Sequence, residues 1–151
     1  MPTIHFQIVT PERVLLDQEV SSISCPTALG EITVLPGHVP LVSTVAPGEI
    51  HVKTPSEDYY MYIAGGFVEI RPGNHVVILA DAAEHYYEID EQRAEEARQR
   101  AVKAMQEKTM SAEEYARVAA SLHQSLTRLN IVRKHAHRRQ RPITSEGVFG
   151  E

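Results

Sequence analysis

The chain changes character near Glu88, a little beyond the middle of its 151 residues. Before that point, short segments rich in Val, Ile and Tyr alternate with Gly and Pro, and beyond it lie most of the Ala, Gln and Arg. Residues 1–88 carry three Lys or Arg against eleven Asp or Glu, whereas residues 89–151 carry twelve against nine. Because composition and charge change together, we predict one domain at 1–88, a second at 89–137 and a disordered tail at 138–151.

The first domain is predicted to be a β-sandwich. Residues Thr3–Thr10 place Ile4, Phe6 and Ile8 at alternate positions, so that one face of this strand is buried. Further β-prone segments follow at 14–24, 32–35, 49–53, 59–64, 67–70 and 75–79. Short strands at this spacing, with Pro and Gly turns and no helical pattern between them, are typical of a small sandwich or barrel.

The second domain is predicted to be an antiparallel two-helix hairpin, which makes the fold class α+β and mainly β. Asp90 is the expected N-cap of the first helix, and Ser111 with Glu114 has the spacing of a capping box for the second. Alanines recur on the first helix at 94, 97, 101 and 104. The second helix carries an apolar stripe of Tyr115, Val118, Leu122, Leu126, Leu129 and Val132. Since the first helix offers few large apolar side chains, we expect the hairpin to be weakly held.

The sequence excludes several classes of protein. No apolar run approaches the roughly 18–20 residues that a membrane-spanning helix needs. A single cysteine, Cys25, cannot form an internal disulfide framework or a cysteine-built metal site. The chain starts without a basic segment followed by an apolar one, so we expect no secretory signal.

No catalytic or metal centre is predicted. The eight histidines are scattered, and no pair has the acid-flanked i, i+4 spacing of a metalloprotease helix. Cys25 precedes Pro26 in a β segment without a nearby base, which favours a small buried residue over a nucleophile. The pairs Gly65-Gly66 and Pro36-Gly37 do not lead into helices, so we interpret them as turns and not as phosphate-binding loops.

Two groups of basic residues leave alternatives open. The end of the second helix is basic, which either complements the helix dipole or binds nucleic acid, an acidic membrane surface or an acidic protein. This group consists of Arg128, Arg133, Lys134, Arg138, Arg139 and Arg141. Arg93 and Arg100 share a face of the first helix. They form either a solvated charged face or, if Arg128 reaches the same place, a phosphate clamp.

Several motifs together resemble the epsilon subunit of F-type ATP synthase. They are the segment Gly30–Leu41, which contains L-P-G-H-x-P-L, the turn Pro47-Gly48, and the segments Gly65–Ile70 and Val77–Ala83. The resemblance extends over roughly residues 3–137. It implies an N-terminal β-sandwich followed by a helical hairpin, which is the architecture inferred above from the residues alone.

The resemblance also implies a role. Members of that family are non-catalytic subunits of a proton-translocating ATP synthase, in the rotating central stalk, where they hold the gamma subunit and sit on the c-ring. Their helices lie folded on the sandwich or extend along gamma into the alpha/beta catalytic head, where they oppose ATP hydrolysis. By motif, Glu31 is expected to face the polar loops of the c-ring, and His38 the gamma subunit or the ring.

Some bacterial members bind ATP on the folded hairpin through an I/L-D-x-x-R-A motif. Ile89, Asp90, Arg93 and Ala94 match this motif. The resemblance implies that Arg93 contacts phosphate and that Asp90 orients the loop and the base.

Further positions accompany the motif in that family. Glu84 and Arg100 match two of them, and the resemblance implies that Arg100 contacts phosphate while Glu84 helps to orient the base. Arg128 matches an arginine of the second helix. Gln124 stands where the family has another arginine, and the loss of one charge-assisted contact predicts roughly ten- to a hundredfold weaker binding.

The resemblance therefore implies no required cofactor, with ATP as a regulatory ligand. We expect no nucleic-acid partner and a membrane association through the complex only, at the cytoplasmic face of the bacterial inner membrane. Two alternatives stay open at this point. The first is that the chain is a free-standing ATP-sensing module. The second is that it is a nucleic-acid adaptor that uses the basic residues from 133 to 141.

Overall fold

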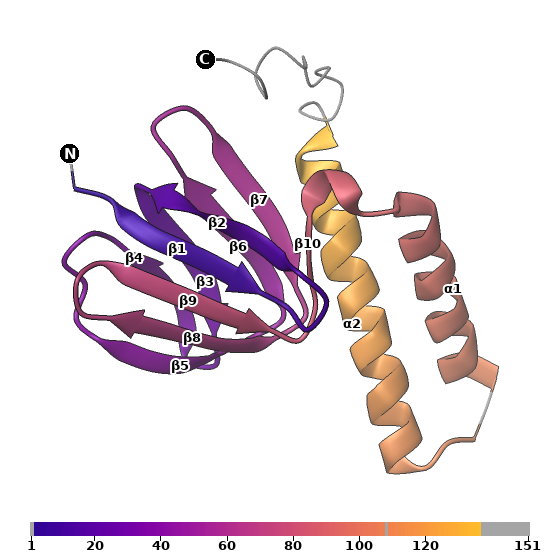
Figure 1. Ribbon diagram of the computed structural model, residues 1–151. Coiled ribbons are helices and arrows are strands. Elements are labelled where there is room, and N and C mark those ends of the chain that lie inside the picture. The colour runs from indigo at the N-terminus through magenta and orange to yellow at the C-terminus, as the bar shows by residue number, and fades with distance from the viewer. Residues whose placement is uncertain (1, 108, 137–151) are drawn as a thin grey trace.

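The computed structural model describes residues 2–107 and 109–136. Strands come first in this part of the chain, and helices follow (Figure 1). The strands are β1 (Ile4–Val9), β2 (Val14–Val20), β3 (Ser22–Thr27), β4 (Gly30–Val34), β5 (Leu41–Val45), β6 (Gly48–Lys53), β7 (Asp58–Ile63), β8 (Gly66–Arg71), β9 (His75–Ala80) and β10 (Ala83–His85). The helices are the 3-10 helix η1 (Tyr86–Glu88), α1 (Glu91–Glu107) and α2 (Ala112–Lys134).

The strands form two layers around one hydrophobic core. One layer has the order β10-β7-β6-β3, with β4 also paired to β3, and the other has the order β5-β8-β9-β1-β2. The pair Thr27–Val45 joins the layers. Phe6, Ile23 and Met61 are fully buried in the core. The predicted fold class, a β-sandwich followed by a helical hairpin, is confirmed.

Strand β7 is apolar on both faces, because the sandwich covers one face and the hairpin the other. Met61 and Ile63 belong to the core between the layers. Tyr62 points the opposite way and packs with Ile131 and Val132 of α2. The helices therefore dock on the outer face of this layer, with α2 next to the strands and α1 on the far side of α2 (Figure 1).

Both predicted helix starts are confirmed. The backbone N–H of Arg93 donates to the Asp90 carboxylate over 3.1 Å, which caps α1. At α2, the backbone N–H of Glu114 donates to the Ser111 hydroxyl over 3.2 Å, and the Glu114 carboxylate accepts from the backbone N–H of Ser111. These local sequence signals therefore fix where each arm of the hairpin begins.

The apolar stripe of α2 differs from the expected one. Leu129 and Val132 are buried, but Tyr115 is 52% exposed and Leu126 is 41% exposed. The difference arises because α2 divides its apolar residues between two neighbours. It packs on α1, whose buried residues are the small Ala94 and Ala101, and its last turns also pack on the sandwich through Ile131 and Val132.

The division of the chain into separate domains stays a prediction. Strand β10 ends at His85, η1 follows, and α1 begins at Glu91, so the predicted boundary at residue 88 falls in the connection between sandwich and hairpin. The predicted tail at 138–151, with the basic residues Arg138, Arg139 and Arg141, lies outside the described residues.

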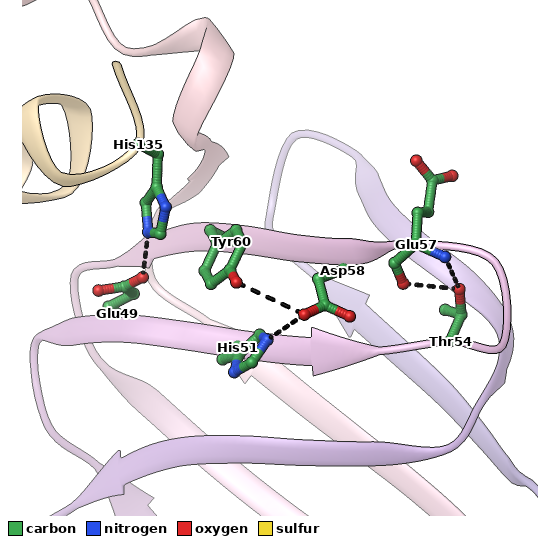
Figure 2. A network of polar contacts seen from close by, with 7 residues as sticks. All are labelled: Glu49, His51, Thr54, Glu57, Asp58, Tyr60 and His135. Carbon is green, nitrogen blue, oxygen red and sulfur yellow. Dashed lines mark hydrogen bonds and ion pairs between the residues drawn. The ribbon is translucent and has the colours of Figure 1, made fainter. Parts of the chain in front are cut away.

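A polar contact fixes the last turn of α2 to the sandwich. His135 is 3% exposed, and its imidazole stacks on the ring of Tyr60 with 3.8 Å between ring centroids. Its Nε2 lies 2.8 Å from the carboxylate of Glu49 on β6, and Lys134 pairs with the same carboxylate over 3.2 Å. Figure 2 shows this contact beside the Tyr60–Asp58–His51 group on the same layer. The docked end of the hairpin thus combines apolar burial with a specific hydrogen bond.

Replacing His135 by alanine is expected to loosen the hairpin. The change removes a ring stack and a hydrogen bond to a carboxylate, together about 2 kcal/mol of docking free energy. Amide hydrogen exchange in the last turns of α2 should then become roughly thirtyfold faster, whereas exchange in β1, β8 and β9 should not change. The matched control is His123→Ala, which removes an exposed histidine from the same helix. Equal exchange in the two variants would contradict this account of docking.

Candidate functional site

A pocket lies where the hinge of the hairpin meets the facing sides of α1 and α2. Its volume is about 280 Å³, close to the lower limit of typical small-molecule sites. All seven residues that the sequence assigned to an ATP site line this pocket, together with two that it did not assign. The lining residues are Glu84, Glu88, Ile89, Asp90, Arg93, Ala94, Ala97, Arg100 and Arg128.

The start of α1 supplies one wall of the pocket. Asp90 caps the helix, and its backbone carbonyl accepts from Ala94 over 3.0 Å. The preceding Ile89 is 1% exposed and packs with Tyr62 and the end of α2, which anchors this turn to the sandwich. The first turn of α1 therefore lines the pocket, with the partial positive charge of the helix N-terminus and the Asp90 carboxylate that caps it.

Two arginines of α1 stand without carboxylate partners. Arg93 and Arg100 are both exposed, and neither makes an ion pair within residues 2–107 and 109–136. Between them, Ala94 and Ala97 offer small side chains to the pocket, which leaves the two guanidinium groups room to reach a ligand. Unpaired guanidinium groups are suited to binding phosphate oxygens.

Arg128 enters the pocket from α2 and is already engaged. Its Nε donates to the carboxylate of Glu84 on β10 over 2.8 Å. Its guanidinium also lies 4.6 Å from the centroid of the Tyr62 ring. Burial raises the pKa of the Tyr62 hydroxyl, while Arg128 opposes that rise and Glu84 adds to it. Arg128 is thus held between the Glu84 carboxylate and a neutral aromatic ring.

A second cavity of about 280 Å³ adjoins the first and shares Glu84, Glu88 and Arg128 with it. It is also lined by Tyr62, by the turn between β1 and β2 at residues 10–13, and by residues 81–83. The Tyr62 hydroxyl is buried and has no hydrogen-bond partner within the described chain. Arg13 of this second cavity pairs with Glu88 of the first over 2.5 Å.

The two residues predicted to contact partners lie away from the pocket. Glu31 is exposed on β4, opposite Pro26 of β3. His38 lies in the loop between β4 and β5, where its Nδ1 is 2.7 Å from the carbonyl oxygen of Val39. That loop is tied to the β8–β9 turn, because Gly37 donates to the Asn74 side chain over 2.7 Å. Glu31 and His38 therefore lie apart from the pocket, on other parts of the sandwich.

The structure also shows the surroundings of the other candidate residues. No group of histidine, cysteine and acidic side chains among the described residues is arranged to hold a metal ion. Burial raises the pKa of the Cys25 thiol to about 11, so this core residue is a poor nucleophile. Arg133 pairs with Glu91 and Glu95 of α1 over 3.5 and 3.6 Å, so it serves contacts within the hairpin.

The fold and the pocket together define a class of protein, a β-sandwich whose docked helical hairpin carries an arginine-lined pocket. Comparisons with known proteins agree with the fold. The family model described as the ATP synthase delta/epsilon chain β-sandwich domain matches residues 3–86, and the long α-helix domain of the same chain matches residues 88–133.

Individual relatives narrow the assignment. The ATP synthase epsilon chain of Herpetosiphon aurantiacus is 42% identical, over 89% of this chain and 98% of its own length. That of Dehalococcoides mccartyi is 39% identical, over 94% of this chain and 99% of its own. A solved chain from the OSCP/F1/c-ring part of the Euglena gracilis mitochondrial ATP synthase has a TM-score of 0.71 and 25% identity, over 83% of this chain and 81% of that one.

The chain belongs to the family of ATP synthase epsilon chains. As an epsilon chain it is a non-catalytic subunit of the F-type complex. This membership favours a subunit over the free-standing sensor and the nucleic-acid adaptor that the sequence had left open.

Proposed function

We propose that this chain is a rotor subunit of the central stalk, which connects the gamma subunit to the c-ring during proton-driven ATP synthesis. Family membership supports this assignment, and so does the similar chain in the Euglena gracilis assembly of catalytic head and c-ring. The sandwich is the docking part, with Glu31 on β4 directed to the c-ring and His38 to gamma or the ring. Both are surface residues with side chains outside the core, as a docking role requires.

The subunit is proposed to associate with the membrane through its complex, at the cytoplasmic face of the bacterial inner membrane. Among the described residues, no helix is long and apolar enough to cross a bilayer. The similar chain in the solved assembly comes from the OSCP/F1/c-ring part of that ATP synthase, which supports the proposed location of this subunit next to the c-ring.

The docked hairpin is proposed to bind ATP. The observation that carries this proposal is the pair of unpartnered arginines, Arg93 in the first turn of α1 and Arg100 about two turns further along, which line one pocket with Arg128. These three guanidinium groups would hold the phosphates. Ile89 and Ala94 supply apolar wall, and Glu84 and Asp90 lie where carboxylates can orient the base and the loop. ATP here is a regulatory ligand and takes no part in a reaction of this chain.

We propose that ATP regulates the position of the hairpin. The pocket takes residues from β10, the hinge, α1 and α2, so it exists only while the hairpin is docked. A ligand that binds only this arrangement stabilises it by mass action. An extended hairpin is proposed to enter the catalytic head and oppose ATP hydrolysis. Bound ATP would therefore hold the hairpin in the docked position, in which it does not oppose ATP hydrolysis.

Calorimetric titration of the whole chain with ATP tests the nucleotide site. The wild type should release or absorb saturable heat, and the double variant Arg93→Gln/Arg100→Gln should bind at least about a hundredfold more weakly, since two charge-assisted contacts are lost. The matched control is Lys103→Gln/Arg117→Gln, which removes the same charge from exposed positions outside the pocket, one on α1 and one on α2. If the wild type gives no heat at millimolar ATP, the nucleotide proposal is wrong.

A further inference from the structure

Glu88 of the pocket is paired by an arginine that comes from outside it. Arg13 lies on the turn between β1 and β2, which is fixed by Thr10: the Thr10 hydroxyl donates to the Arg13 carbonyl over 3.0 Å and accepts from the Arg13 N–H over 3.1 Å. From this turn the Arg13 guanidinium reaches Glu88 in η1, which is 75 residues away in sequence. The hydrogen bond with Glu88 raises the pKa of Arg13, so its charge is secure.

The charges lining the pocket show what this pair does. Three carboxylates face three arginines, so without outside help the lining is electrically neutral. Glu84 is bound by Arg128, and Asp90 caps α1. Within the described chain, Glu88 has its ion pair only with Arg13, whose side chain lines the neighbouring cavity and not this one.

We propose that Arg13 is a positioning residue of the nucleotide pocket, which neutralises Glu88 and thereby allows a polyphosphate to bind next to it. This inference rests on the proposed ATP site, and it adds a residue of the sandwich to the groups that determine nucleotide affinity. With Arg13 of the β1–β2 turn added, three carboxylates stand against four arginines, so Arg93 and Arg100 remain uncompensated for a ligand. Nucleotide affinity then depends on contact between that turn and the hinge as well as on the two helices.

The size of the effect follows from electrostatics at a half-exposed site. When Arg13 is removed, the unpaired Glu88 carboxylate in the lining of this pocket is expected to weaken polyphosphate binding by about three- to tenfold. The same loss should shrink as salt is raised, because mobile ions screen the added repulsion. Neutralising Glu88 instead should leave Arg13 as an extra cation and improve binding by a similar factor.

A purely structural role for this ion pair predicts a different pattern. If the pair only tethers the hinge to the sandwich, then removing either partner breaks the same contact. Arg13→Gln and Glu88→Gln would then weaken binding to the same degree, and the double variant would be no better than either. The charge proposal predicts opposite signs for the two single variants and recovery in the double variant, within about twofold of the wild type.

The experiment is calorimetric titration of the full chain and of these three variants with ATP and with inorganic tripolyphosphate. Arg71→Gln is the matched control, since Arg71 has the same side-chain exposure of 48% as Arg13 and pairs with Glu69 on β8. We expect Arg13→Gln to weaken both ligands three- to tenfold, the double variant to recover, and the control to match the wild type. Wild-type binding with unchanged affinity in Arg13→Gln, or with no recovery in the double variant, would overturn this inference alone. Absence of wild-type binding would overturn the proposed nucleotide site together with it.

Discussion

Replacing Gly66 by alanine should destabilise the sandwich by more than about 3 kcal/mol. Gly66 opens β8 with φ +146°, a conformation that side chains rarely adopt. It is also packed against the opposite strand. A Cβ atom at this position would overlap the carbonyl oxygen of Leu79 and lie 2.9 Å from the Cα of Ala80. Since these are backbone atoms of the paired strand β9, the alanine can be accommodated only by breaking the pairing.

Thermal unfolding of the whole chain measures this effect. A loss of 3 kcal/mol in a sandwich of this size corresponds to roughly 12–24 °C in Tm. Gly73→Ala is the matched control, because Gly73 also has a positive φ, of +84°, but a Cβ there meets nothing within 4 Å. It should cost only about 1–2 kcal/mol of backbone strain. Equal losses of stability in the two variants would contradict this explanation, because the close contact between Gly66 and β9 would then add nothing to the cost of the substitution.

Regular patterns made most of the fold predictable. Alternation placed Ile4, Phe6 and Ile8 on a buried face of β1, and side-chain caps marked both helix starts at Asp90 and Ser111. In each case the signal is local, because strand alternation and capping need only neighbouring residues. The pair Gly65-Gly66 was predicted to be a turn, and the structure places Gly65 in the connection between β7 and β8 and Gly66 as the first residue of β8.

The elements that the sequence did not reveal depend on distant partners. Strand β5 (Leu41–Val45) has few buried residues and is fixed by pairing along β8. Strand β10 (Ala83–His85) has three residues and exists through its pairing with β7. Neither has a hydrophobic period long enough to detect. The exposed Tyr115 and Leu126 follow the same principle, since helical spacing cannot tell which part of a stripe has a neighbour.

The residues of the candidate site also fall into two groups, those that a sequence motif predicted and those that only the tertiary structure brings together. Seven residues were predicted through one motif and its accompanying positions, and the structure gathers all of them in one pocket. Glu88 and Ala97 complete the lining without belonging to the motif. Arg13 and Tyr62 join the site only through tertiary structure, because the β1–β2 turn and β7 approach the hinge in space. His135 was predicted only as one of eight scattered histidines without a metal-binding pattern, and its role appears only when Glu49 and Tyr60 are seen beside it.

Removing the hairpin is expected to release the restraint on ATP hydrolysis. A chain that ends at Glu88 keeps the whole core between the two layers, because that core is built from residues 4–80. It loses both helices, which we propose to be the part that enters the catalytic head. The sandwich should therefore still dock on gamma, although the outer faces of Tyr60 and Tyr62 become exposed.

The most direct test of this account is the rate of ATP hydrolysis by the assembled catalytic head and gamma, measured with the full chain and with the chain ending at Glu88. Co-purification with gamma confirms in each sample that the stalk is assembled. The account predicts a several-fold higher rate with the shortened chain. Equal rates in two fully assembled samples would contradict it, because the hairpin would then not inhibit ATP hydrolysis.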